Sequence, residues 1–173
     1  PVLSIRKEGN TPAWGAVYEQ YFQEIDKVKG QKGVLSVEKK LFVETNNGTN
    51  RQIRPVTPEQ PLRIGDKVIV RLTIRTDREM NYVFLKDLRA GCFEPADQLS
   101  GPESRDGIWY YRSPKDVSEN FFINRLPEGT FVLEYPVYVS RSGEYAGGIS
   151  TIQCMYAPEF VSHTAGESLR IMP

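Results

Sequence analysis

The sequence predicts an all-β protein that folds as an antiparallel, immunoglobulin-like β-sandwich. Two observations predict this class. Apolar and polar residues alternate with a period of two through several runs, which is the pattern of a strand with one buried face. Turn residues separate these runs, and no long helical period lies between them.

The first strand is predicted near residues 35–44, where Phe42 is the one apolar residue on the polar side. The apolar side is formed by Leu35, Val37, Leu41 and Val43. The segment Asn46-Asn47-Gly48-Thr49 follows, and its residues accept the positive φ that a hairpin turn needs. Asn47-Gly48-Thr49 also matches a glycosylation acceptor pattern, but a hairpin turn explains it without a sugar.

Two more strands are predicted at residues 67–75 and 131–140, each with apolar residues at every second position. Pro136 cannot donate to a ladder, so we expect it at a sheet edge or a bulge. Residues 90–106 form the longest segment without a strand pattern. Loops of this length are often functional.

The first thirty residues fit two patterns. Trp14, Ala16, Tyr18 and Gln20 alternate as in a strand, whereas Tyr18, Tyr21, Phe22 and Ile25 would share a helical face. We favour the strand. The basic, glycine-containing segment 27–33 indicates a boundary near residue 30, so residues 1–30 are expected to be an extension and residues 31–173 the sandwich domain. The chain begins at Pro1 within an apolar run, as expected of a mature or excised fragment.

Composition excludes several classes of partner. The 173 residues include 22 Lys+Arg and 22 Asp+Glu, so the net charge is zero. Neither nucleic acid nor an anionic membrane finds an attracting field on such a chain. No run approaches the ~18 apolar residues of a membrane span, so we expect no direct membrane insertion by this chain.

The residues that usually carry catalysis are scarce. His163 is the only histidine, in a polar turn sequence that predicts a surface position. Two cysteines and one histidine cannot form a closed four-ligand zinc site, and no glycine-rich phosphate loop follows a strand. We therefore expect no catalysis, no metal and no cofactor. The one foothold for an enzyme is the 90–106 loop with Glu94 and Asp97.

The two cysteines and the aromatic clusters each allow two interpretations. Cys92 and Cys154 could form one disulfide or be two small buried hydrophobes. The segments 108–111 and 121–122 would normally pack in the core. If Trp109 and Phe121 were exposed on one face, they would instead favour a stand-alone binding module for carbohydrate or protein in a cell-envelope protein.

The segment Gln153-Cys154-Met155-Tyr156-Ala157-Pro158-Glu159-Phe160 is the most informative one. It places soft, bulky side chains before an Ala-Pro break, after the strand-like run 148–152. Large apolar side chains at a strand end usually contact something, either within the chain or in a larger protein.

Several motifs in sequence order resemble the C-terminal macroglobulin-like domain of bacterial alpha-2-macroglobulins. The likeness covers roughly residues 31–173, and the cysteines with Trp109-Tyr110-Tyr111 resemble its Bacteroidetes version. Residues 1–29 are similar to the stretch that returns from the thioester domain through a CUB-like domain. The motifs of the sandwich are Gly65-Asp66 with the strand after it, residues 77–83 and 85–87, Ala90-Gly91-Cys92-Phe93-Glu94-Pro95, residues 129–135, Gly143-Glu144-Tyr145 and the Met155-Tyr156 segment.

The resemblance implies a macroglobulin-like β-sandwich within an endopeptidase inhibitor, a protease trap that is secreted or lies in the bacterial cell envelope or periplasm. Its partners would be the thioester domain and other neighbouring domains of the same parent chain, with target proteases engaged by the whole protein. The likeness assigns Met155 and Tyr156 to shielding the thioester, with Pro158 and Phe160 shaping their loop.

The physical chemistry of these side chains suits such a role. A thioester survives only where water and amines are kept away, and excluding water suppresses side reactions. Methionine is flexible and fills irregular gaps, while tyrosine covers a large area and keeps its hydroxyl hydrogen-bonded. The sequence itself contains no Cys-x-x-Gln thioester motif.

Overall fold

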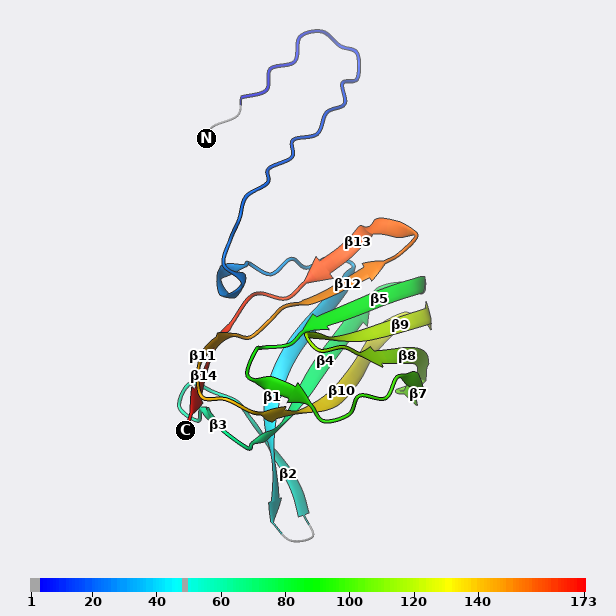
Figure 1. Ribbon diagram of the computed structural model, residues 1–173. Coiled ribbons are helices and arrows are strands. Elements are labelled where there is room, and N and C mark those ends of the chain that lie inside the picture. The colour runs from blue at the N-terminus through cyan, green and yellow to red at the C-terminus, as the bar shows by residue number, and fades with distance from the viewer. Residues whose placement is uncertain (1–3, 48–49) are drawn as a thin grey trace.

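Two antiparallel sheets face each other and enclose the core (Figure 1). The computed structural model describes residues 4–47 and 50–173. Within these residues the one helical element is a 3-10 turn, η1 (Ile25–Lys27), and no helix is long and apolar enough to cross a membrane. The predicted all-β sandwich is therefore confirmed.

The strands form three sheets. The five-stranded sheet has the order β2-β1-β4-β10-β6, and the six-stranded sheet has the order β13-β12-β5-β9-β8-β7. A small third sheet, β11-β14-β3, contains the one parallel pair, β14 with β3. The strand bounds are β1 (Leu35–Asn47), β2 (Asn50–Pro55), β3 (Leu62–Arg63), β4 (Lys67–Thr76), β5 (Met80–Leu88), β6 (Phe93–Pro95), β7 (Gly101–Arg105), β8 (Ile108–Pro114), β9 (Ser118–Leu126), β10 (Gly129–Val139), β11 (Gly143–Ala146), β12 (Ser150–Cys154), β13 (Ala157–His163) and β14 (Ser168–Met172).

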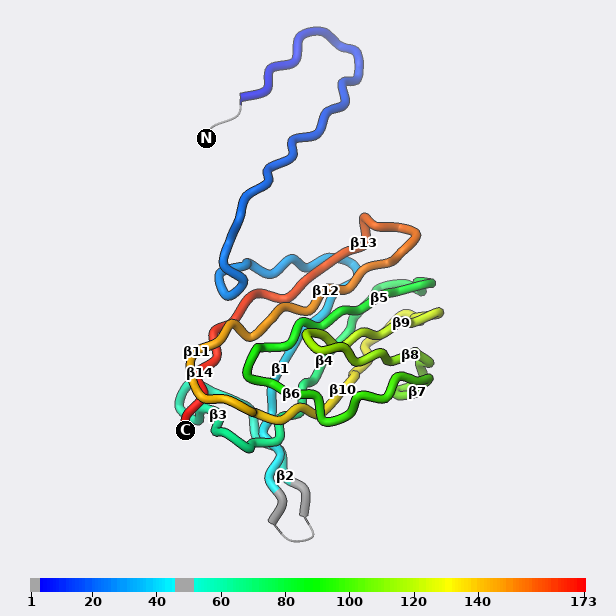
Figure 2. Tube along the Cα trace, viewed as in Figure 1, coloured from blue at the N-terminus to red at the C-terminus, as the bar shows by residue number. Residues whose placement is uncertain are grey.

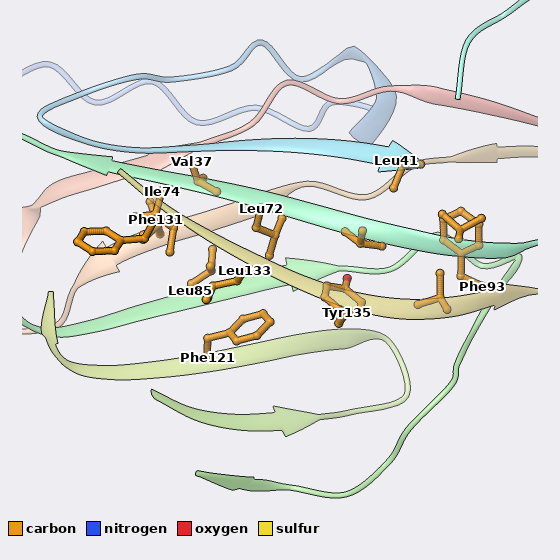
Figure 3. Close-up of a cluster of buried hydrophobic side chains, with 14 of the residues drawn as sticks. Val37, Leu41, Leu72, Ile74, Leu85, Phe93, Phe121, Phe131, Leu133 and Tyr135 are labelled. Atoms are coloured by element: carbon orange, nitrogen blue, oxygen red, sulfur yellow. The ribbon is translucent and has the colours of Figure 1, made fainter. Parts of the chain in front are cut away.

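The core forms where the inward residues of the two large sheets meet. Leu72 and Leu133 from the five-stranded sheet face Leu85 and Phe121 from the six-stranded sheet (Figure 3). All four are almost fully buried, and burying such a side chain contributes about 1.5–3 kcal/mol. The period-two alternation read from the sequence thus marks the faces that pack together.

The β1–β2 hairpin extends beyond the sandwich (Figure 1). Its strands pair out to Asn47 and Asn50, while the predicted turn residues Gly48 and Thr49, with the glycosylation pattern, lie outside the described residues. Phe42, the apolar exception in β1, lies beneath the guanidinium of Arg71, whose Cζ is 4.4 Å from the ring centroid. A cation–π contact therefore covers this ring on the outer face.

The sequence predicts that Pro136 lies at a sheet edge or a bulge, and its position in the sheet meets that expectation only locally. β10 is an inner strand, so the edge prediction is wrong for the strand as a whole. However, β6 pairs only with residues 137–139 of β10, and the carbonyl of Pro136 accepts a hydrogen bond from Ala96, just past the end of β6. Pro136 has no N–H to donate, but β6 has already ended beside it, so no ladder hydrogen bond is lost at this position.

Two other expectations are corrected by the structure. The segment 90–106 is not an irregular loop, because it contains β6 and β7. Residues 14–20 do not form a strand, because no strand among residues 4–47 and 50–173 pairs with them. Residues 4–24 instead run as an exposed arm without helix or strand, away from the sandwich (Figure 2).

The segment after the arm is fastened to the loop between β13 and β14. Gln31 forms a two-way backbone bridge with His163, and the N–H of Gly166 donates to the carbonyl of Val28 at 2.8 Å. The Ser168 hydroxyl donates to the Asp26 carboxylate at 3.1 Å. A side chain at position 166 would collide with the carbonyl of Ile25, so glycine permits this close approach.

Candidate functional site

The candidate site is the turn between β12 and β13, which consists of Met155 and Tyr156. Cys154 and Ala157 pair on either side of it, so the two side chains stand at the tip of a hairpin. Met155 is 56% exposed and Tyr156 is 81% exposed. Two large side chains are thus held out to solvent at the end of a paired hairpin.

A bulge in β13 shapes the hairpin next to the turn. Gln153 pairs with Val161, but the next residue, Cys154, pairs with Ala157, so residues 158–160 form an extra loop on one strand. Pro158 suits this loop because it has no N–H to leave unpaired. The ring of Phe160 packs partly against the core, and the guanidinium carbon of Arg78 lies 5.8 Å from its centroid.

Tyr82 in β5 supports the turn from the neighbouring strand. Its carbonyl accepts a hydrogen bond from the N–H of Met155 at 2.9 Å, and its ring meets the ring of Tyr156 edge-on, with centroids 5.2 Å apart. Tyr82 has a φ of 56°, a left-handed conformation that costs a residue with a side chain about 1–2 kcal/mol. Sequence reasoning missed Tyr82, because a glycine or asparagine would have signalled such a backbone and a tyrosine does not.

The two cysteines do not form the disulfide that their count permits. Both are free and buried. Cys154 lies opposite Val83 near the start of β5, whereas Cys92 follows the far end of that strand, and β-strands rise about 3.3 Å per residue. Disulfide bonding requires Cα atoms within about 7 Å, so the two thiols are too far apart.

Each cysteine has its own environment. The Cys154 thiol donates to the Asn81 carbonyl at 3.2 Å, directly beneath the turn. Burial raises the pKa of the Cys92 thiol to about 11, so this thiol stays protonated and unreactive near neutral pH.

His163, Asp97 and Glu94 each have a local environment of their own. His163 is half-buried, its backbone pairs with that of Gln31, and its Nδ1 lies 3.1 Å from the Thr164 carbonyl oxygen. Asp97 accepts the N–H of Leu99 at 2.9 Å, and Glu94 is an exposed residue of β6. Across residues 4–47 and 50–173, no three His, Cys, Asp or Glu side chains gather as metal ligands would.

A buried charged cluster joins the two sheets. The Asp87 carboxylate in β5 accepts from the Lys39 ammonium of β1 at 2.8 Å, from the Ser150 hydroxyl at 2.8 Å and from the Tyr135 hydroxyl of β10. Burial, together with the Asp87 carboxylate, raises the pKa of Tyr135 well above its ordinary value. The tyrosine therefore acts as a permanent donor, and the cluster ties the layers together.

A second group of buried charges lies beside it in the six-stranded sheet. The Glu119 carboxylate accepts from Arg112 at 2.6 Å and from Arg89 at 3.1 Å. Burial raises the pKa of Glu119, against the two guanidinium charges that favour its ionised form. Its charged atoms face the protein interior, so we assign these residues to the fold.

The aromatic clusters divide between the two faces of the six-stranded sheet. Tyr110 and Phe121 are buried, as core packing predicts, while Trp109, Tyr111 and Phe122 are 70%, 47% and 39% exposed. The carbohydrate platform required Trp109 and Phe121 on one exposed face, and Phe121 does not meet that condition. Consecutive residues in a strand point to opposite faces, so an aromatic run in a strand cannot place all of its rings on one face.

Comparison with known proteins places this geometry in a family. A family model described as the bacterial alpha-2-macroglobulin MG10 domain matches residues 35–159. A curated relative, circularly permutated Ras protein 2 of Dictyostelium discoideum, is 28% identical over 109 residues, which cover 63% of this chain and 3% of that protein.

Solved structures of bacterial alpha-2-macroglobulins share the fold. Salmonella alpha-2-macroglobulin reacted with methylamine is 21% identical with a TM-score of 0.65, over 84% of this chain and 10% of that chain. Native Escherichia coli alpha-2-macroglobulin from domain MG7 to the C-terminus is 16% identical with a TM-score of 0.64, over 83% of this chain and 24% of that chain. The chain thus spans a quarter or less of each of these relatives.

Proposed function

The chain belongs to the family of bacterial alpha-2-macroglobulin MG10 domains, and from this premise we propose that it is a non-catalytic docking domain of a protease trap. In this proposal the Met155–Tyr156 turn covers a reactive thioester held by a neighbouring domain of the same parent chain. The parent would act on endopeptidases in the cell envelope, the periplasm or the extracellular space.

The single observation that carries the proposal is the presentation of the turn. Met155 and Tyr156 are largely exposed, yet their backbone is fixed by the Cys154–Ala157 pair and by the Tyr82 carbonyl. Fixing exposed apolar side chains in advance lowers the entropy lost on binding. Such a turn is suited to pack onto a partner, since an exposed apolar tip contributes little to the stability of the chain itself.

The chemistry of the two side chains suits a cover over an electrophile. Neither a thioether nor a phenol is a strong nucleophile, while both side chains exclude water over a large area. The bulge at Pro158 and the packing of Phe160 hold the hairpin at a set angle. The carbonyl carbon of the thioester would remain intact until a conformational change lifts this cover.

The experiment uses the full-length parent protein, in which the proposal requires a Cys-x-x-Gln thioester. We expect the double variant Met155→Ala, Tyr156→Ala to react faster with methylamine, with a tenfold increase for each ~1.4 kcal/mol by which the barrier falls. Tyr138→Ala is the matched control, because Tyr138 is a half-exposed tyrosine on the outer face of the other sheet. An unchanged rate in the double variant would sink the shielding role.

A second measurement addresses the chain alone. It carries no Cys-x-x-Gln motif, so the 173-residue chain should leave protease activity unaffected in a peptidase assay. Inhibition by this chain at stoichiometric concentration would contradict a docking role.

A further inference from the structure

The outer faces of the two large sheets differ in chemistry. The face of the five-stranded sheet carries ion pairs, among them Arg71 with Glu134 at 2.6 Å and Lys67 with Glu44 at 2.8 Å. Antiparallel sheets commonly present such a polar face to water. The charged side chains of this face are thus suited to contact with water.

The outer face of the six-stranded sheet carries a row of aromatic rings. Phe84 of β5 lies opposite Phe122 of β9, and Phe122 lies opposite Tyr111 of β8. The Phe84 and Phe122 rings stack with centroids 4.9 Å apart. Trp109 precedes Tyr111 by two residues, so it lies on the same side of β8, and it is 70% exposed. We call these four residues the aromatic row.

The aromatic row is continuous with the candidate site. Tyr82 precedes Phe84 by two residues on β5, and its ring contacts that of Tyr156. At the other end, a hollow of about 450 Å³ is lined by Trp109, Tyr111, Phe122 and Pro102. A partner that packed against the Met155–Tyr156 turn and spread along the sheet would thus cover the row and fill this hollow.

The composition of the row is that of a protein contact surface. Monomeric proteins rarely leave large contiguous apolar patches in water, and tryptophan and tyrosine dominate the binding energy of protein interfaces. Lys86 is an exposed charge beside Phe84 on the same face of β5. A complementary surface would therefore be apolar and would bring a carboxylate to Lys86.

We propose that the aromatic row is a docking surface for the same neighbouring domain that the Met155–Tyr156 turn covers, an inference that rests on the proposed function. The partner presents a flat apolar protein surface with an acidic side chain opposite Lys86. The hairpin tip and the sheet face then form one contact, with Tyr82 joining them.

The test compares oxidative footprinting of the 173-residue chain and of the native full-length parent. Trp109 and Tyr111 should be labelled several-fold more slowly in the parent than in the chain, together with Met155. Tyr138 on the polar sheet is the internal control and should be labelled equally in both.

The possible failures are distinguishable. Equal labelling of Trp109 in both proteins, with Met155 protected, overturns the docking surface and leaves the turn as the contact. Protection of Trp109 with Met155 still labelled supports a covered face but contradicts the shielding turn. If Trp109 is labelled equally and soluble oligosaccharides quench its fluorescence in a Trp14→Phe background, the face is a carbohydrate surface and the proposal is wrong.

A pair of variants in the parent adds a functional readout. Trp109→Ser, Tyr111→Ser should raise the rate of methylamine reaction although the turn itself is intact, whereas Tyr138→Ser should not. Because all three positions lie on outer faces, the chains are expected to fold, and a thermal melt of each variant verifies this. If the folded Trp109→Ser, Tyr111→Ser variant reacts with methylamine at the wild-type rate, the aromatic row is not a docking surface.

Discussion

The ring of Tyr156 meets the ring of Tyr82 edge-on at an interplanar angle of 82°. The N–H of the preceding residue, Met155, donates a hydrogen bond to the Tyr82 carbonyl. The exposed turn therefore rests on a residue of another strand. That residue is in the left-handed region of φ, so the support stores backbone strain at the site where the turn is presented.

Replacing Tyr82 should separate the contribution of the ring from that of the backbone. Asparagine tolerates the left-handed conformation but removes the ring, so Tyr82→Asn should lower the free energy of unfolding by about 1 kcal/mol. Valine removes the ring as well, and unlike asparagine it does not tolerate the left-handed conformation. Tyr82→Val should therefore lower the free energy of unfolding by ~1–2 kcal/mol more than Tyr82→Asn does. Urea unfolding measures both, and equal stability of the two variants would show that the φ of Tyr82 carries no strain.

Removing the buried carboxylate of Asp87 should be the most destabilising change among those considered. Asp87→Asn leaves the Lys39 ammonium buried without its counter-charge, which typically lowers the free energy of unfolding by about 3–5 kcal/mol. The double variant Lys39→Met, Asp87→Asn removes both charges, keeps an acceptor oxygen for the Ser150 and Tyr135 hydroxyls and should recover much of that loss. If calorimetry finds the double variant no more stable than Asp87→Asn, the ion pair is not the source of the effect.

Glu134 predicts an acid-sensitive contribution to stability. Its partial burial alone would raise its pKa, but hydrogen bonds from Arg71 and Arg105 outweigh burial and hold the pKa below its ordinary value of 4.5. A carboxyl whose pKa is lowered on folding stabilises the folded state above pH 4.5, and this stabilisation is lost as the pH falls through the folded-state pKa. Glu134→Gln should therefore lower the free energy of unfolding by about 1 kcal/mol near pH 7.

The same comparison at acid pH checks the sign. The gap in urea midpoint between the wild type and Glu134→Gln should close as the pH falls below the folded-state pKa. A gap that stays constant down to pH 2.5 would mean that charge pairing with the two arginines contributes nothing.

Alkylation should show that both cysteines are free thiols and that they are buried in the native chain. Iodoacetamide should modify Cys92 slowly in the native chain, because the thiol is buried and its raised pKa of about 11 leaves little thiolate at pH 8. After denaturation without a reductant, mass spectrometry should find both Cys92 and Cys154 alkylated. Protection of both from alkylation in the denatured chain would indicate a disulfide.

The long strands were predictable because burial on one side imposes a period on the sequence. β1, β4 and β10 each bury alternate residues against the opposite sheet. β7 could not be found in this way, since none of its five residues is buried and the strand lies at a sheet edge. A strand that buries neither face leaves no alternation to read.

The errors at the N-terminus and at the site have different causes. Trp14, Ala16 and Tyr18 alternate as a strand should, but alternation shows a face that can be buried, not that a neighbour is present to pair with it. At the site, the turn could be located from Met155 and Tyr156, whereas the support comes from Tyr82, which lies 74 positions before Tyr156 in the sequence. No local pattern encodes such a contact.

The fastening of residues 26–31 to the loop after β13 gives the arm a mechanical consequence. Tension applied to residues 4–24 enters the sandwich through the Gln31–His163 bridge and the Val28–Gly166 hydrogen bond. Both lie at the end of β13 opposite to the Met155–Tyr156 turn. β13 is an edge strand, paired within its sheet to β12 alone, so a pull on the arm loads a strand that is held on one side, and the load acts on the same hairpin that presents the Met155–Tyr156 turn at its other end.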